Sequence, residues 1–330
     1  MYAKTTFPEF SGAFRIHHDQ ALYACGSCFA NTLADQLARL KFQLIRHPFG
    51  IAFNPLVMAG QLERMLSRKT YSESELILQD GLYHSLDHHG SYSHPDPAVT
   101  LDHIGMQLEQ GYIGLSGASV LVITLGSAHY YRLKRDGRIA ANCHKIPQNE
   151  FQKSRATVED MTIALRNAFQ SLRTLNPQIR ILMSVSPVRY LRDGFEENAR
   201  SKAALLLTID QLQSELDYVH YFPAYEIFMD DLRDYRYTAE DLVHPSPAAV
   251  EYIWKYFERA YFEEDTQTCV NMIRGLQQLL HHRIMHPGSE AFKLYLASLN
   301  QRLQEIQKAF PKLDVQEEAE RIRALRLSAG

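Results

Sequence analysis

The chain has few of the features that mark secreted or nucleic-acid-binding proteins. It contains four cysteines and one tryptophan in 330 residues, and four cysteines are too few for a disulfide framework in a chain of this length. Lys and Arg total 35 against 38 Asp and Glu, so no field of one sign attracts nucleic acid or an anionic membrane. We expect reduced thiols, no nucleic-acid partner and no membrane partner.

Long apolar segments are also missing. Nowhere do about 18 apolar residues follow one another, which is the length that a membrane-spanning helix needs. The first residues, MYAKTTFPEFSGAFRIHHDQ, contain no apolar run of the kind found in a secretory signal. We therefore expect a cytoplasmic protein, and the 45% of hydrophobic residues is enough for a large core.

Short β-type runs alternate with amphipathic segments of helical length over the first 262 residues. This alternation is typical of a parallel sheet with helices on both faces. It predicts a doubly wound, flavodoxin-like α/β domain over 1–262. Strands are expected at 21–24, 42–46, 120–125, 181–185 and 219–222, with helices after residue 28, from a cap at Asn54, from a capping box at Thr157 and Asp160, and at 198–216 and 247–262.

Three segments are expected to add to this alternation. Asp136 and Gly137 predict a hairpin turn between 130–133 and 139–142, inserted after a central strand. The stretch 71–97 is polar and without period, so it predicts a long loop. Residues 263–330 show only helical runs and predict a helical extension, for which three roles fit: a packing layer, a lid, or an interface in a homo-oligomer.

Ser27 stands where the first strand is expected to give way to a helix. At this edge of a parallel sheet a side chain lies near the ligand crevice, and the amides of the helix point toward it. An anionic intermediate formed at Ser27 would meet hydrogen-bond donors there. The structural alternative is that Ser27 only caps the helix.

Asp241 and His244 lie three residues apart, after the last expected strand. A turn of this length brings both side chains to one side. A serine hydroxyl is a weak nucleophile until a histidine takes its proton, and a carboxylate orients that histidine. Asp-x-x-His also occurs by chance as a loop or capping pair, but here the pair and Ser27 follow the last and first strands of one predicted sheet.

The string at 26–30 resembles the signature that names the GSCFA domain family, a branch of the SGNH (GDSL-like) hydrolases. The resemblance spans roughly residues 5–260 and includes HPFGIAFNP at 47–55, TLGS at 124–127, NCHKIP at 142–147, SVSPVR at 184–189 and DLVHPS at 241–246. It implies Ser27 as the nucleophile, His244 as the general base and Asp241 as its orienting carboxylate. It also implies no metal and no organic cofactor.

The resemblance further implies an oxyanion hole. In SGNH enzymes the donors are the serine amide, a glycine amide after the second strand and an asparagine side chain after the third, so Ser27 and Gly50 match by position. The third motif departs from the pattern, because Ala128 stands where the asparagine is expected. Asn142 on the predicted hairpin is a possible replacement, and local backbone satisfaction is its structural alternative.

Other residues admit further interpretations. Cys25 and Cys28 form a CxxC that a thiol-redox centre would use, and Cys28 could itself be the nucleophile. The polar loop carries histidines and aspartates of the types found in metal sites, namely His84, Asp87, His88, His89, His94 and Asp96, but without compact metal-ligand spacing. His84, His89 and Ser127 are candidates for the substrate cleft, and Tyr130, Tyr131 and Trp254 for sugar stacking or ordinary core packing.

These interpretations converge on a serine esterase. The expected substrate is an O-acyl ester, favoured as O-acetyl on a carbohydrate by the resemblance alone, hydrolysed through an acyl-enzyme. One alternative is an O-acyltransferase with the same triad. The others are a thiol-redox protein and a carbohydrate-binding protein that has lost catalysis.

Overall fold

The computed structural model describes residues 6–282 and 289–327. Residue contacts group the chain into two compact units. The sheet unit comprises Met1–Phe10, Ala21–Asp35 and Leu44–Phe257, and the helical unit comprises Ser11–Gln20, Gln36–Gln43 and Glu258–Gly330. The boundary predicted at residue 262 stays a prediction, and the first five residues of the segment inspected for a secretory signal lie outside the described residues.

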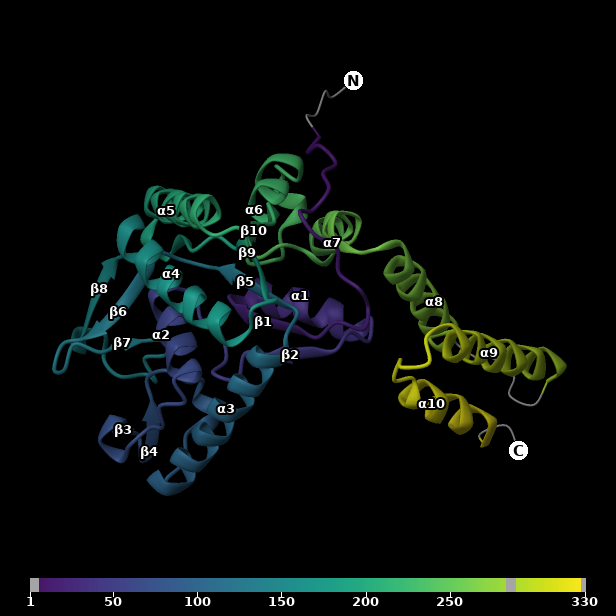
Figure 1. Ribbon diagram of the computed structural model, residues 1–330, viewed down its shortest axis with the longest axis horizontal. Helices are drawn as coiled ribbons and strands as arrows, with labels where there is room; N and C mark the ends of the chain where they lie inside the picture. Colours follow the sequence, from purple (N-terminus) through teal and green to yellow (C-terminus); the bar gives the residue numbers. More distant parts are fainter. Residues whose placement is uncertain (1–5, 283–288, 328–330) are drawn as a thin grey trace. The chain divides into compact units, whose positions relative to one another are not determined.

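The sheet unit is built on five parallel strands in the order β10-β9-β5-β1-β2 (Figure 1). Counted along the chain among themselves, these strands lie in the order 2-1-3-4-5, which is that of flavodoxin-like sheets. The predicted α/β fold with a central parallel sheet is confirmed. The strands are β1 (Leu22–Gly26), β2 (Leu44–Arg46), β5 (Val120–Leu125), β9 (Arg180–Val185) and β10 (Val219–Tyr221).

Helices cover the sheet because its strands are apolar on both faces. Every residue of β5 is buried, which is typical of a central parallel strand. On one face, Tyr23, Ile123 and Met183 share a core with apolar side chains of α2, α3, α4 and α5. The helices that lie wholly or partly in this unit are α1 (Cys28–Arg39), α2 (Pro55–Leu66), α3 (Pro97–Gly117), α4 (Val158–Leu175), α5 (Phe195–Glu215), α6 (Ala224–Glu226) and α7 (Pro247–Tyr261).

Two helices begin at caps that the sequence predicts. The Asn54 side chain accepts a hydrogen bond from the Leu56 amide at 2.8 Å, and the Thr157 hydroxyl accepts one from the Asp160 amide at 3.0 Å. These bonds satisfy amides that have no acceptor within the helix. The predicted starts of α2 and α4 are therefore confirmed.

The prediction of a long loop over 71–97 is wrong. Strands β3 (Leu76–Gln79) and β4 (Leu82–Ser85) form an antiparallel hairpin there. Its turn residues, Asp80 and Gly81, both have positive φ, as a two-residue hairpin turn requires. Ile77 packs in a small core with Leu133 and other residues distant in sequence.

The hairpin predicted around Asp136 and Gly137 is confirmed, and it is part of a larger sheet. Strands β6 (His129–Leu133) and β7 (Ile139–Ala140) pair antiparallel. A third strand, β8 (Phe151–Arg155), pairs with the other edge of β6. The sequence analysis missed β8.

The helical unit contains α8 (Glu264–Leu280), α9 (Glu290–Ala309) and α10 (Gln316–Leu327), and Figure 1 shows α9 and α10 side by side. Leu276, Leu299 and Ile322 lie in their shared core. The described residues after 263 form helices and turns, as the sequence predicts. In the described parts of both units, no helix combines the length and apolar character needed to cross a membrane.

Candidate active site

A cleft of about 680 Å³ lies at the carboxyl ends of β1 and β5. Ser27 follows β1, and Gly126 and Ser127 follow β5, and all three line the cleft. The strand order reverses between β1 and β5, and ligands of open α/β sheets bind at such a reversal. His244, in the loop before α7, lines the same cleft.

The backbone places Ser27 at the junction of β1 and α1. Gly26 has φ +132°, and a Cβ there would lie 2.3 Å from the Thr124 carbonyl oxygen, so glycine is required. The Ser27 amide donates to the Thr124 carbonyl at 2.9 Å and the Ser27 carbonyl accepts from the Ala30 amide at 2.9 Å. Ser27 therefore ends the strand ladder and begins the helix.

The Ser27 hydroxyl is buried without a hydrogen-bond partner. The residue is 2% exposed, and its Oγ exposes less than 1 Å² and contacts no donor or acceptor among the described residues. The alternative that Ser27 caps α1 through its side chain is therefore not what the structure contains. Buried polar groups without a partner are rare because they cost free energy, so this hydroxyl adds no hydrogen bond that stabilises the fold.

Asp241 and His244 form a hydrogen-bonded pair. His244 Nδ1 and Asp241 Oδ2 lie 2.6 Å apart, and Asp241 Oδ1 accepts from the amides of His244 and Val243, each at 3.0 Å. These backbone bonds and the imidazole lower the pKa of Asp241 to about 2. The carboxylate thus stays ionised, fixes the ring and leaves His244 Nε2 for another partner.

Arg189 ties this loop to the segment after β9. Its Nη2 donates to the Leu242 carbonyl at 2.7 Å, and its amide donates to the Val243 carbonyl at 3.4 Å. Leu242 has φ +59°, a conformation that non-glycine residues seldom adopt without support. The sequence analysis quoted this arginine within a motif but gave it no role.

The three candidate oxyanion donors differ in their present bonds. The Ser27 amide is bonded to Thr124, and the Gly50 amide donates to the His47 carbonyl at 3.2 Å. Gly50 does not line the cleft, but Asn142 does. Asn142 Oδ1 accepts from the His144 amide at 3.0 Å, which leaves its Nδ2 as a donor.

Of the three residues predicted for the substrate cleft, two line it and one does not. His89 and Ser127 line the cleft, whereas His84 does not. Both ring nitrogens of His84 are occupied inside the β3–β4 region, by the Ser93 hydroxyl at 2.5 Å and the Gln79 carbonyl at 3.1 Å. Across the described residues, no three His, Cys, Asp or Glu side chains gather as metal ligands would.

His88 is a cleft residue to which the sequence analysis gave no such role. It is 1% exposed, its ring stacks on Phe49 at 4.2 Å, and its Nδ1 lies 2.8 Å from the Ser85 hydroxyl. Its Nε2 is buried without a partner among the described residues. Burial lowers the pKa of His88 to about 3, so the ring is neutral. The sequence alone gave no sign that His88 is buried at the cleft.

The thiol alternatives find little support in the geometry. Cys25 is buried and Cys28 half-buried, and both are free cysteines. Burial raises the pKa of both thiols, which disfavours the thiolate that redox or nucleophilic chemistry needs. Cys25 instead contacts the Met58 sulfur at 3.9 Å, inside the core.

No curated protein matches the chain. The sequence pattern of the GSCFA family matches residues 21–257, a range that contains Ser27, Asp241 and His244. The pattern of the GSCFA domain protein C-terminal domain matches residues 273–325, from within α8 into α10. Because the first match alone covers more than half of the sequence, the chain belongs to the GSCFA family.

Proposed function

We propose that this protein is a serine esterase of the SGNH type that acts on O-acyl esters. One observation carries the proposal: Ser27 and His244 line the same cleft although more than two hundred residues separate them. Asp241, 2.6 Å from the far ring nitrogen of His244, completes the set of groups that activates a serine. The unpartnered Ser27 hydroxyl supports the proposal because a nucleophile must be free to react.

The proposed reaction begins with a rotation about the Ser27 Cα–Cβ bond, which brings the buried Oγ into the cleft. His244 Nε2 takes the hydroxyl proton as Oγ attacks the ester carbonyl. The tetrahedral intermediate collapses, His244 gives the proton to the leaving alcohol, and the acyl group stays on Ser27. Water, deprotonated by His244, then releases the acid. Asp241 stabilises the charged imidazole in both steps.

The oxyanion requires donors near Ser27. We propose Asn142 Nδ2 together with the N-terminal amides of α1, which have no intrahelical acceptor. The Ser27 and Gly50 amides join them only after their bonds to Thr124 and His47 lengthen. Removal of one such donor raises an acyl-transfer barrier by about 3 kcal/mol, so the contribution of Asn142 is measurable.

The favoured substrate is a small acyl group, such as acetyl, on a carbohydrate. Tyr130 and Tyr131 line the cleft and offer rings to a sugar, whereas Trp254 is wholly buried and serves the core. If a second alcohol replaces water in the last step, the same groups make the protein an O-acyltransferase. Neither reaction requires a cofactor.

The test is active-site labelling with a fluorophosphonate and turnover of 4-nitrophenyl acetate. Both should be present in the natural protein and in Cys28→Ala, and absent in Ser27→Ala. Cys28 is a matched control because it adjoins Ser27 and lines the same cleft. Loss only in the Cys28 variant would replace the esterase with thiol chemistry, and inactivity of all three proteins would favour a carbohydrate-binding protein.

A further inference from the structure

The charged side chains that line the cleft are all basic. Lys145 follows β7, and Arg189 and Arg192 follow β9, while no Asp or Glu belongs to the described lining. Composition does not explain this, because the whole chain has 38 acidic against 35 basic side chains. The cleft is therefore a basic region of a slightly acidic protein.

Three carboxylates near the cleft loops already have partners, whereas Glu150, between the lining residues Gln148 and Phe151, has no ion pair among the described residues. Asp193 pairs with Lys153, Glu197 pairs with Arg155 at 2.9 Å, and Asp241 pairs with His244. Within the described residues, Lys145 and Arg192 have no ion pair, and Arg189 donates to the Leu242 carbonyl. Lys145 and Arg192 are both exposed, so their charges remain for a ligand.

Two aromatic rings also belong to the cleft lining. Tyr131 and Tyr190 line the cleft with Arg192, and the Lys153 ammonium lies 5.7 Å from the Tyr131 ring centroid and 5.3 Å from that of Tyr190. Rings of this kind pack against the apolar face of a sugar.

We infer that the cleft selects O-acylated sugars that carry an anionic group, a carboxylate or a phosphate. The inference rests on the proposed esterase function and adds the substrate class. Arg192 can bind either a carboxylate or a phosphate through two parallel N–H groups, and Lys145 adds a positive point charge. Because both side chains are exposed, each adds only a few-fold to recognition, and salt weakens the effect.

The test compares two esters that differ in one charge: a monoacetylated methyl glucuronoside and its uronamide. The anionic ester should have a kcat/KM about ten-fold higher, mainly through KM, and the advantage should shrink as salt is raised to about 0.5 M. In the double variant Lys145→Gln, Arg192→Gln the ratio should approach one. The control is the double variant Arg233→Gln, Lys293→Gln, which removes one arginine and one lysine charge outside the cleft lining and should keep the ratio.

The outcomes separate this inference from the esterase proposal. Hydrolysis of both esters with equal kcat/KM overturns the charge selection and leaves the esterase intact. If neither ester reacts, titration calorimetry with the unacetylated glucuronoside and its uronamide decides: preferential binding of the anion supports the inference, and equal or absent binding overturns it. A third ester, an acetylated methyl glucoside 6-phosphate, distinguishes a carboxylate from a phosphate as the recognised group.

Discussion

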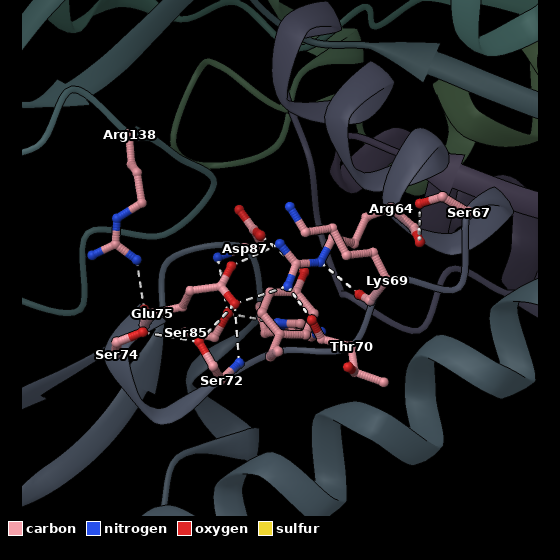
Figure 2. A network of polar contacts seen from close by, with 12 residues as sticks. Arg64, Ser67, Lys69, Thr70, Ser72, Ser74, Glu75, Ser85, Asp87 and Arg138 are labelled. Atoms are coloured by element: carbon pink, nitrogen blue, oxygen red, sulfur yellow. Dashed lines mark hydrogen bonds and ion pairs between the residues drawn. The ribbon is translucent and has the colours of Figure 1, made fainter.

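Two polar regions of the sheet unit differ in how far their polar groups are hydrogen-bonded. Around Arg64 the partners are complete (Figure 2): the guanidinium binds both carboxylate oxygens of Glu75, at 2.7 and 3.1 Å, and donates to the carbonyls of Lys69 and Thr70. In the cleft, Ser27 Oγ and His88 Nε2 have no partner among the described residues.

On the proposed function, the difference separates a polar network that stabilises the fold from a polar site that binds a substrate. A buried polar group left without a hydrogen bond costs about 1–3 kcal/mol, and the proposed nucleophilic role accounts for such a group at Ser27. The Arg64 network also borders a cavity, of about 240 Å³, but its charged groups already bind one another. We expect substitutions in the cleft to change activity, and substitutions in the network to change stability.

Ser27→Ala should give the largest loss of activity with no loss of stability. Ester turnover should fall about 10⁴-fold or more, as when the nucleophile of a triad is removed. The melting temperature should stay or rise slightly, because the lost hydroxyl makes no hydrogen bond. Steady-state kinetics and calorimetry measure the two effects, and an active variant would remove Ser27 from the mechanism.

Arg64→Met should show the reverse pattern. Arg64 is 14% and Glu75 31% exposed in their side chains, and the arginine holds the pKa of Glu75 at about 2. Its loss should lower the free energy of unfolding by about 2 kcal/mol, between the values for exposed and buried pairs, with kcat/KM unchanged. Urea denaturation measures this.

Arg68→Met is the matched control for that substitution. Arg68 forms a more exposed pair with Glu109, at 55% and 44% side-chain exposure, and its loss should cost less than about 0.5 kcal/mol. Equal losses in the two variants would contradict the view that the Arg64 network is a stabilising one.

His47 should make stability depend on pH. Its ring lies 3.1 Å from the Tyr23 hydroxyl and 3.0 Å from the Gln61 side chain, and burial lowers its pKa to about 4. Between pH 6.5 and 4 the unfolded chain therefore binds more protons than the folded one, so the free energy of unfolding falls as pH falls, by on the order of 2 kcal/mol. His47→Gln should flatten this dependence in urea titrations, and His103→Gln, on the exposed surface of α3, should not.

Arg189→Ala should lower kcat about ten-fold, a much smaller loss of turnover than that of Ser27→Ala. The arginine bonds to the Leu242 carbonyl and so positions the loop that carries Asp241 and His244 without touching the ester. Added guanidinium should restore part of kcat in this variant and do nothing for His244→Ala. Unchanged kcat would show that the loop holds its geometry without this tie.

Sequence patterns determined the parts of this protein that depend on neighbouring residues. The first strand, Gly26, Ser27 and the helix after them follow from local periodicity and turn chemistry, as do the cap at Asn54 and the turn at Asp136. Asp241 and His244 can pair because three residues of turn separate them. Local rules of this kind were enough to predict the parallel sheet, since each βα unit repeats the same pattern.

Only the tertiary structure decided which distant groups meet. The β3–β4 hairpin packs against apolar partners such as Leu133 and Phe151, but its Asp80-Gly81 turn is the same local signal that predicts the hairpin at Asp136. The burial of His88, the tie from Arg189 to Leu242 and the bond that occupies the Ser27 amide arise between segments brought together by the order of strands. Burial, hydrogen-bond satisfaction and pKa depend on the surrounding atoms in space, and those neighbours come from other parts of the chain.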